Sequence, residues 1–283
     1  MTPSRLEAAR HAVESAGAAL MNLRGKMPQG RSAGHGQLKT AADAAAEGWV
    51  LGYLRDAFPG DQFLCEESFE GAGAPWKAPR AFWTVDALDG TRSFAEGFDG
   101  FCVQTAYVEG GRVTLGAVHE PVRKVTYWAE AGKGAFARGP EGGSRRLACR
   151  AAASGSPWPA EPVFVDSRPP AGRAGGLMAR VSGRFLECGS IGLKICRVAE
   201  GLADVYVKEI VFKLWDAAPG EIILAEAGGK LGLWTGEPIP YGGSQVYFEN
   251  ILAAPAGIFE AAALKLGKSS VCRSSEFSSG SSR

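Results

Sequence analysis

Two aspartates, Asp86 and Asp89, stand where an apolar run ends and the chain turns at Gly90. The run over residues 81–85 predicts a buried strand, and Thr91 is typical of a residue that caps a short helix. Mg²⁺ prefers carboxylate oxygens, and the start of a helix offers backbone N–H groups to a phosphate. One short turn of this kind could therefore hold a magnesium ion beside the phosphate that it activates. The alternative is an acid-rich surface turn with a capping threonine.

Two further acidic candidates precede this turn. Glu66 begins an acidic pair at the end of a short strand predicted over residues 61–65, and acidic pairs at strand ends are usually solvated. Asp43 lies three residues after Thr40 at the start of a predicted helix, in the spacing of a capping box. Each position has an ordinary structural explanation, so neither indicates chemistry by itself.

Another acidic candidate, Asp216, follows Trp215 in the last third of the chain. It precedes a helix predicted over residues 217–227, which has proline in its first turn and glycine after its end. This position predicts an N-cap, whose side chain accepts a hydrogen bond from the backbone of the helix. One carboxylate oxygen can serve as the cap while the other binds a metal, so the two roles are compatible.

The composition is typical of a globular protein. The 283 residues suffice for one large or two ordinary domains, with 46% apolar and 22% charged residues. The net charge of +1 disfavours a nucleic-acid or membrane partner bound by bulk electrostatics. The six cysteines contain no Cys-x-x-Cys pair, which favours reduced thiols. The charges at Arg5, Glu7 and Arg10 do not fit a signal peptide, so we expect a cytoplasmic protein.

The N-terminal unit, residues 1–142, is expected to combine helices with an antiparallel sheet. Helical spacing of apolar residues predicts one helix after Thr2 and another after Thr40. The segment 25–39, rich in Gly, Lys and Arg, predicts an exposed loop and a possible lid. Three later runs, separated by short turns, predict consecutive strands over residues 101–108, 113–118 and 125–128.

A Gly- and Pro-rich run indicates a boundary, after which residues 143–267 form the expected C-terminal unit. Strands and helices alternate in this unit, which predicts an α/β layer. The predicted elements are strands over 163–165, 185–187 and 204–207, and helices over 172–181, 191–201 and 217–227. The serine-rich tail, residues 268–283, has no core pattern, so we expect it to be disordered or vector-derived.

Three motifs together resemble one known family. They are Asp-Ala-Leu-Asp-Gly-Thr at 86–91, Glu-Glu-Ser at 66–68 and Trp-Asp-Ala-Ala at 215–218. The chain closely resembles the inositol monophosphatase superfamily of Mg²⁺-dependent, lithium-sensitive phosphomonoesterases over most of its length. The resemblance implies a mixed α/β fold, the layered αβαβα sandwich of the inositol monophosphatase and sugar phosphatase type. It also implies a homodimer.

The motifs carry the family's functional positions over to this chain. The resemblance implies metal ligands from Glu66, Asp86, the backbone carbonyl of Leu88, Asp89 and Asp216. Glu66 stands at the family's distance before Asp86. Thr91 matches the threonine of the family's Asp-Gly-Thr turn, and Asp43 matches the aspartate paired with it. Glu66 and Thr91, with Asp43 orienting Thr91, would then position and deprotonate the attacking water.

A cluster of four buried carboxylates is unfavourable unless cations neutralise it, so we expect two or three Mg²⁺ per site. Two such ions lie about 4 Å apart, polarise the phosphate oxygens and lower the pKa of a bound water, which is the nucleophile. The chain departs from the family at Cys65, Ala87 and Ser93, where Gly, Pro, and Asn or Glu are usual. None of these departures removes a ligating oxygen.

The region from Gly189 to Tyr206 bears on which phosphate ester is cleaved. Its Leu-Lys-x-Cys-x-Val-Ala-Glu-Gly run resembles the 3′(2′),5′-bisphosphate nucleotidases, whereas the inositol enzymes usually have Asn or Asp at the position of Lys194. Lys208 falls where the nucleotidases tend to carry Arg, and a second phosphate needs a cation. Glu209 would instead be the acid that binds inositol hydroxyls if the one-residue gap between this chain and the family's motif were placed differently.

We therefore favour 3′-phosphoadenosine 5′-phosphate as the substrate, with inositol 1-phosphate as the alternative. The expected phosphate and substrate contacts are Asp89, Gly90, Thr91, Gly189, Ser190, Lys194, Lys208 and Glu209. An alternative of another class is a non-catalytic family member that binds a metabolite, which loss of a ligand carboxylate would indicate; none is lost. A P-loop is excluded because Ala262 replaces its first glycine, and Cys188 breaks a nucleophile elbow.

Overall fold

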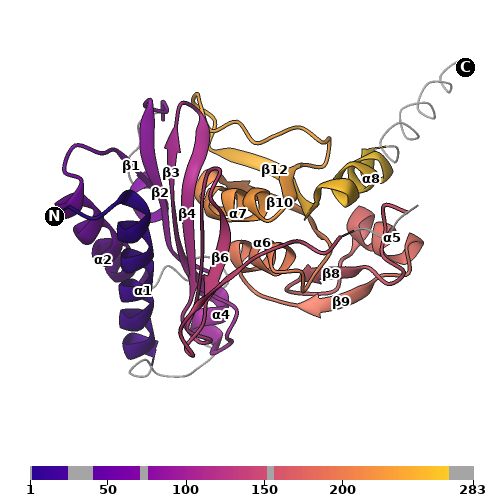
Figure 1. The fold of residues 1–283 in the computed structure, drawn as a ribbon, viewed down its shortest axis with the longest axis horizontal. Helices are drawn as coiled ribbons and strands as arrows, with labels where there is room; N and C mark the ends of the chain where they lie inside the picture. Colours follow the sequence, from indigo (N-terminus) through magenta and orange to yellow (C-terminus); the bar gives the residue numbers. More distant parts are fainter. Residues whose placement is uncertain (1, 25–40, 71–75, 152–155, 268–283) are drawn as a thin grey trace, which may run out of the picture.

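The computed structural model describes residues 2–24, 41–70, 76–151 and 156–267, and these form five stacked layers (Figure 1). The first layer is a pair of helices, α1 (Arg5–Arg24) and α2 (Ala41–Ala57). Both pack on one face of a large sheet, because α1 turns Val13 and Leu20 inward and α2 does the same with Val50 and Leu54. The expected helices after Thr2 and Thr40 are thereby confirmed, although Thr40 itself lies outside the described residues.

The second layer is a seven-stranded sheet in which neighbours in sequence are neighbours in space. The first strand, β1, runs parallel to β2, and every later pair is antiparallel, as predicted for the three central strands. The strands are β1 (Phe63–Cys65), β2 (Ala81–Asp89), β3 (Cys102–Glu109), β4 (Arg112–Glu120), β5 (Val125–Glu130), β6 (Gly134–Arg138) and β7 (Ser144–Arg146).

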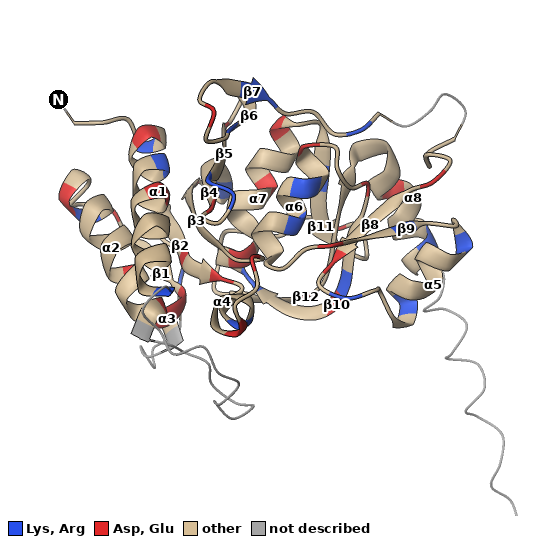
Figure 2. Cartoon of the chain, turned by 90° about the horizontal axis from the view of Figure 1, so that it is seen from below, with Lys and Arg blue, Asp and Glu red and all other residues tan. Residues whose placement is uncertain are grey.

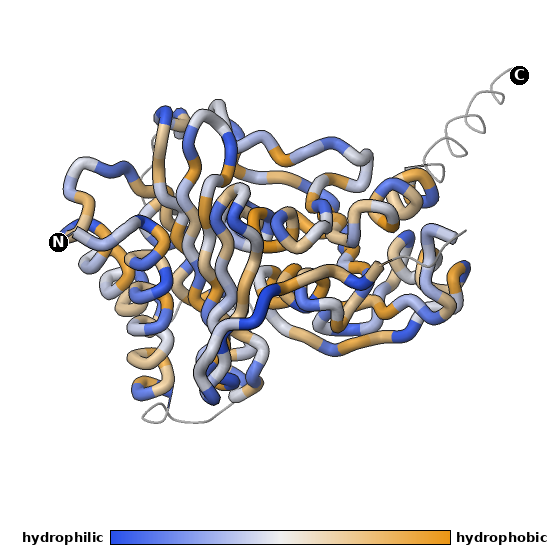
Figure 3. Tube along the Cα trace, in the orientation of Figure 1, coloured by the Kyte–Doolittle hydropathy of each residue, from blue (hydrophilic) through white to orange (hydrophobic). Residues whose placement is uncertain are grey.

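The third layer consists of α6 (Ile191–Ala199) and α7 (Leu214–Glu226), which lie between this sheet and a second one (Figure 1). A helix between two sheets must be apolar on most of its surface. The sequence of α7 meets this condition, since Trp215, Ile223 and Leu224 are fully buried. In Figure 3 hydrophobic segments gather along this middle layer and the strands beside it.

The fourth layer is built from β10 (Tyr206–Lys213), β12 (Tyr247–Pro255) and β11 (Gly229–Leu233), which pair antiparallel in that order. A parallel pair, β8 (Val163–Asp166) and β9 (Arg184–Glu187), joins it through a bridge between Phe164 and Val205. The fifth layer is α5 (Gly172–Arg180) and α8 (Ala256–Gly267). The expected αβαβα sandwich is confirmed, and the predicted alternation over residues 163–227 is observed.

The predicted division between residues 142 and 143 stays a prediction. The strand after it, β7, pairs with β6 and extends the first sheet. One hydrophobic cluster contains residues of both predicted units, such as Phe82 and Ile195. The segment 25–39 and the tail 268–283 lie outside the described residues. No described helix is long and apolar enough to cross a membrane.

Two short helices follow the strands that carry the acidic motifs: α3 (Glu66–Glu70) after β1 and α4 (Thr91–Glu96) after β2. The assignment of Thr91 as a cap was wrong, because Gly90 is the N-cap residue and adopts φ 94°. A side chain at Gly90 would also meet the carbonyl oxygen of Gly100. A left-handed conformation at a crowded position explains why the turn needs glycine.

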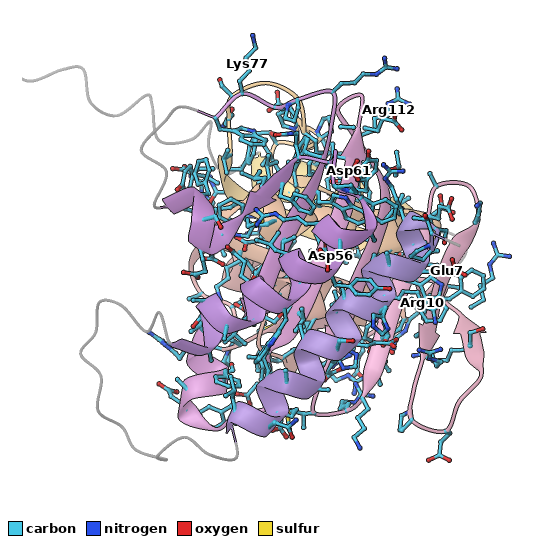
Figure 4. All side chains as sticks on the ribbon, turned by 90° about the vertical axis from the view of Figure 1, so that its left-hand side faces the viewer. Glu7, Arg10, Asp56, Asp61, Lys77 and Arg112 are labelled. Atoms are coloured by element: carbon cyan, nitrogen blue, oxygen red, sulfur yellow. The ribbon has the colours of Figure 1, made fainter. Side chains whose placement is uncertain are left out.

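The outer surface of the first layer carries exposed charged side chains. Figure 4 views this surface and labels Glu7 on α1 and Asp56 on α2, which are both exposed. Arg5 forms an ion pair with Asp61 at 2.9 Å, and Asp61 also accepts a hydrogen bond from the indole of Trp83. These contacts fix α1 against the edge of the sheet that carries β1.

Candidate active site

The two aspartates of the turn reach the same face of the sheet because the end of β2 is irregular. Asp86 pairs with Gln104 and Asp89 with Cys102, so three steps on β2 oppose two steps on β3. Residues three apart on a regular strand point to opposite faces, and one extra residue brings them to the same face. The Leu88 N–H closes the bulge by donating to Asp86 Oδ1 at 3.1 Å.

Glu66 lies beside Asp86 because β1 and β2 are parallel and in register, with Cys65 opposite Val85. Both carboxylates therefore leave the sheet at the carboxyl ends of neighbouring strands. Asp216 joins them from α7. One carboxylate oxygen from each of these three acids lies within 4.8 Å of the other two. Figure 2 shows α3 and α4 close to this end of β2, with acidic segments around them.

Asp216 is held in place by its own helix. The helix begins at Leu214 and not at residue 217, so Asp216 is its third residue and the prediction of an N-cap was wrong. Its Oδ2 atom accepts the backbone N–H of Lys213, the actual cap residue, at 2.7 Å. One oxygen of Asp216 thus satisfies the helix start, and the carboxylate as a whole lies beside those of Glu66 and Asp86.

Asp89 is tied to the start of α6. Its Oδ2 atom accepts hydrogen bonds from the Ser190 hydroxyl at 2.5 Å and from the Gly192 N–H at 2.8 Å. Ser190 caps α6 and also accepts the N–H of Leu193. Gly189 packs so closely on Gly100 that an added Cβ would lie 2.2 Å from the Gly100 carbonyl oxygen. Gly189 and Ser190 therefore lie beside Asp89, as part of its support.

Thr91 links the turn to the first layer. Its hydroxyl lies 3.0 Å from Asp43 Oδ1 and 3.1 Å from the Leu88 carbonyl oxygen, and it can donate to either. The structure thus brings Asp43, Thr91 and Leu88 together, as the sequence motifs suggested. Their roles in catalysis stay predictions.

The four acids Glu66, Asp86, Asp89 and Asp216 all have raised pKa values, and burial is the main cause in each. The pKa of Asp86 lies well above its usual range, because the other three carboxylates add repulsion to its burial. Burial and the nearby Asp89 charge raise the pKa of Asp216 to about 8. Lys213 opposes this effect at Glu66, where its Nζ lies 3.2 Å from Oε1.

This donor set fits magnesium. It offers only oxygen atoms, mainly from carboxylates, which are the ligands that a hard divalent cation prefers. The raised pKa values show that the folded chain does not balance these charges by itself. A divalent cation among Glu66, Asp86 and Asp216 would remove this imbalance.

A basic cluster lies on the far side of Asp89. Lys194, on α6, is 4% exposed and forms an ion pair with Asp166 at 3.1 Å. Lys208, on β10, reaches the same Asp166 oxygen at 2.7 Å and contacts the Ser167 hydroxyl at 3.3 Å. Although burial acts in the opposite direction, the two lysines lower the pKa of Asp166. Two lysine side chains thus share one carboxylate, and burial lowers the pKa of Lys194.

Glu209 points away from this cluster. Its carboxylate lies 4.0 Å from the Nε of Arg173 on α5, and 49% of the side chain is exposed. It also crowds Gly172, the first residue of α5. The predicted pair of substrate contacts at Lys208 and Glu209 is therefore divided between two faces of the sheet.

The motifs did not single out three residues that support the site. Gln104 donates its amide to Asp86 Oδ2 and Asp89 Oδ2, both at 3.3 Å. Glu47 holds the start of α3, and Lys213 contacts Glu66. A polar Gln104 inside an otherwise apolar strand was a visible signal. Glu47 and Lys213 gave none, because surface-like charges are common on helices and strand ends.

Comparisons with known proteins identify relatives along almost the whole chain. The model of the inositol monophosphatase family matches residues 3–270. A curated inositol monophosphatase 3 of Solanum lycopersicum is 31% identical over 195 residues, which are 68% of this chain and 72% of the relative. The 3′(2′),5′-bisphosphate nucleotidase CysQ of Escherichia coli K12 is 34% identical over 208 residues, 71% of this chain and 78% of the relative.

Solved structures give the same result for the fold. An IMPase of Thermotoga maritima superposes with a TM-score of 0.72 at 25% identity, covering 91% of this chain and 94% of its own. An inositol monophosphatase from Anabaena gives 0.69 at 25% identity, covering 93% and 95%.

Proposed function

Since the chain belongs to the inositol monophosphatase family and is therefore a phosphoric monoester hydrolase, we propose that it is Mg²⁺-dependent and cleaves 3′-phosphoadenosine 5′-phosphate. The observation that supports magnesium dependence is the cluster of buried, mutually repelling carboxylates. The observation that supports a bisphosphate is the pair of lysines behind Asp89.

The cation would be held by Glu66, Asp86, Asp89 and Asp216, with the Leu88 carbonyl as a further oxygen. When bound, Mg²⁺ would neutralise the carboxylates, polarise the phosphate oxygens and make a water more acidic. Gln104 and the start of α6 fix one oxygen of Asp89, so its second oxygen has a defined direction. Such fixed ligands matter because phosphoryl transfer depends mainly on placement and charge neutralisation.

Glu66 and Thr91 would position the attacking water. The Thr91 hydroxyl directs its proton to Asp43 or to the Leu88 carbonyl, so its oxygen can accept a hydrogen bond from the water. The Glu66 carboxylate would then take the proton that the water loses. The phosphate would lie against the N–H groups of Gly90 and Thr91, which have no acceptor within α4.

The second phosphate would bind at Lys208. Tyr206 and Lys208 are two residues apart on β10 and share a face, and Tyr206 is packed in the core beside Lys194. Lys208 therefore points to the side on which α6 and Asp89 lie, while the next residue, Glu209, points to α5. A cation on the inner face favours an anionic substituent over inositol hydroxyls.

The alternative, an inositol-1-monophosphatase, is favoured by the relative in Solanum lycopersicum. It would require an acid facing the substrate, and Glu209 pairs with Arg173 instead. A non-catalytic, metabolite-binding protein would be expected to lack part of the acidic cluster. The chain keeps every carboxylate of that cluster.

The test is phosphate release with Mg²⁺ from 3′-phosphoadenosine 5′-phosphate and from inositol 1-phosphate, measured side by side. We expect a higher kcat/KM for the nucleotide and a loss of that preference in Lys208→Gln. Lys230→Gln, which removes a half-exposed lysine paired with Glu260, is the control. A preference for inositol 1-phosphate would replace the nucleotide proposal, and no release from either ester would support the non-catalytic alternative.

We also propose that the protein works as a cytoplasmic homodimer with two or three Mg²⁺ per site. The five cysteines that the structure describes are free thiols, as a reducing compartment would keep them. Analytical ultracentrifugation and metal analysis of the purified protein would check the assembly and the number of ions.

A further inference from the structure

Helix α2 carries two buried carboxylates one turn apart, Asp43 and Glu47. Each side chain belongs to a residue that is 5% exposed. Residues four apart lie on the same face of a helix, so both acids face the sheet. Asp43 accepts the hydroxyl of Thr91. Glu47 was described above only as a contact of α3, and no role in the reaction has been given to it.

Glu47 binds the first turn of α3 with both oxygens. Its Oε2 atom accepts the backbone N–H of Glu67 at 3.0 Å, and its Oε1 atom accepts the Ser68 hydroxyl. The first N–H groups of a helix have no partner within the helix, and Glu47 supplies one from another element. Hydrogen bonds to an ionised carboxylate are also stronger than neutral ones.

Glu66 depends on this contact because the strand before it is short. It is the first residue of α3 and follows β1, which is three residues long and pairs with β2 alone. The next two residues, Glu67 and Ser68, are the ones that Glu47 binds. The position of the Glu66 backbone is therefore set by β2 on one side, and on the other by Glu47 and by the packing of Phe69 on Trp215.

We propose that Glu47 is a positioning residue for the hydrolytic reaction. Through Asp43 and Glu47, one rigid helix holds both Thr91 and the segment that carries Glu66, and so it sets the distance between them. This inference rests on the proposed roles of Glu66 and Thr91. A displacement of about 1 Å between reacting groups is enough to slow a reaction by about 100-fold. Contacts that fix the distance between such groups therefore have a direct effect on the rate.

The experiment compares Glu47→Ala, Glu47→Gln and Ser68→Ala with the control Asp56→Asn. Asp56 is an exposed acid on the same helix and is labelled in Figure 4. Two quantities are measured on each folded variant: kcat and KM for the ester that the wild-type enzyme hydrolyses, and the Mg²⁺ concentration at the midpoint of thermal stabilisation.

We expect Glu47→Ala to lower kcat and to raise the Mg²⁺ midpoint, each by about 10-fold or more, as for other residues that support metal ligands. KM should change little, because the phosphate contacts at Gly90 and Thr91 are held by Asp43. Glu47→Gln keeps one acceptor oxygen and should recover part of both losses. The double variant with Ser68→Ala should be no worse than Glu47→Ala alone, since both changes break the same link.

The proposal would be overturned if folded Glu47→Ala kept the kcat and the Mg²⁺ midpoint of the wild type. It would also be overturned if the effects of Glu47→Ala and Ser68→Ala on these two quantities were fully additive in the double variant. If Glu47→Ala does not fold, Glu47→Gln and Ser68→Ala decide by the same two measurements. Failure of the proposed function is distinguishable, because an inactive wild-type protein would still show the Mg²⁺ midpoint and its shift.

Discussion

Asp86 lies among the three other carboxylates of the site. It is 2% exposed, and three other carboxylates raise its pKa in addition to burial. Its contacts with Gln104 and the Leu88 N–H compensate only part of the charge. Asp86 is therefore expected to destabilise the protein without metal and to stabilise it with metal bound, as is typical of a residue in a metal-binding site.

Asp86→Asn should fold normally and lose activity by about 100-fold or more, because one carboxylate of the proposed cation site is removed. The unfolding temperature without Mg²⁺ should stay equal or rise, since a buried charge is lost. Phosphate release and differential scanning calorimetry check both effects. Near wild-type turnover would remove Asp86 from the metal site.

Lys213 contributes a positive charge next to Glu66, with its Nζ atom 3.2 Å from Glu66 Oε1. An ammonium group competes with a metal ion for the same carboxylate. Lys213→Gln should therefore bind Mg²⁺ about three- to tenfold more tightly, as expected for loss of one nearby, partly screened charge. Isothermal titration calorimetry measures this, and Lys213→Arg serves as the charge-conserving control. Weaker Mg²⁺ binding by the Gln variant would contradict the prediction.

At the scale of elements, the site is assembled from strand ends and helix starts, which pack closely because glycine residues lie at the contact. The closest approach joins the segment before β3 to the start of α6, where Gly100 and Gly189 meet backbone to backbone. A side chain at either position has no space. This contact fixes the distance between Asp89 and Ser190.

Gly189→Ala should lower the free energy of unfolding by about 1 to 3 kcal/mol, as overpacking does, and should also reduce activity by displacing Ser190 from Asp89. Chemical denaturation and initial rates are the measurements. Gly257→Ala on α8 is the control, because an added Cβ there meets nothing within 4 Å. Equal stability of the two variants would show that the Gly100 contact is not a constraint.

Helix α7 carries a second acid, Glu221, which is partly buried and accepts the hydroxyl of Tyr241. Burial raises its pKa from 4.5 to about 7, against the effect of this hydrogen bond. The folded state therefore favours the neutral acid. The stability that this group contributes is complete below about pH 4.5 and is lost as the pH rises through about 7.

Glu221→Gln should remove this pH dependence. The variant should be more stable than the wild type at pH 8 by up to about 3 kcal/mol, the free energy that corresponds to the rise of the pKa from 4.5 to about 7. The two proteins should differ little at pH 4.5. Urea unfolding at several pH values measures the difference, and a constant offset across this range would contradict the assignment to Glu221.

At the scale of the whole molecule, the acidic cluster lies between layers. Glu66 and Asp86 leave the first sheet, while Asp216 comes from the middle helix layer. A cation bound by all three connects the sheet to α7. Metal binding should therefore stabilise the fold as a unit and not only one loop.

Removal of divalent cations by a chelator should lower the unfolding temperature, and Mg²⁺ should restore it. At a Mg²⁺ concentration about 100 times the dissociation constant, the expected gain is about 2.7 kcal/mol. Thermal scans across a Mg²⁺ series check this, with Asp86→Asn as the variant that should not respond. An unfolding temperature that ignores both chelator and Mg²⁺ would contradict a metal site between the layers.

The sequence by itself determined the family through three motifs, and the resemblance to that family implied the layered fold. Apolar periodicity predicted most elements, and the Asp-Ala-Leu-Asp-Gly-Thr turn predicted the acidic centre. Cap positions were wrong at Thr91 and Asp216, since a helix start depends on backbone angles that a capping residue type does not fix.

The tertiary structure alone decided which side chains point where. One extra residue in β2 brings Asp86 and Asp89 to a common face, while the adjacent residues Lys208 and Glu209 of β10 lie on opposite faces. Strand side chains alternate with a period of two, so a shift of one residue reverses their direction, and only the pairing with the neighbouring strand shows where it occurs. The contact of Glu47 with Ser68 is likewise tertiary, because it joins elements that are separate along the chain.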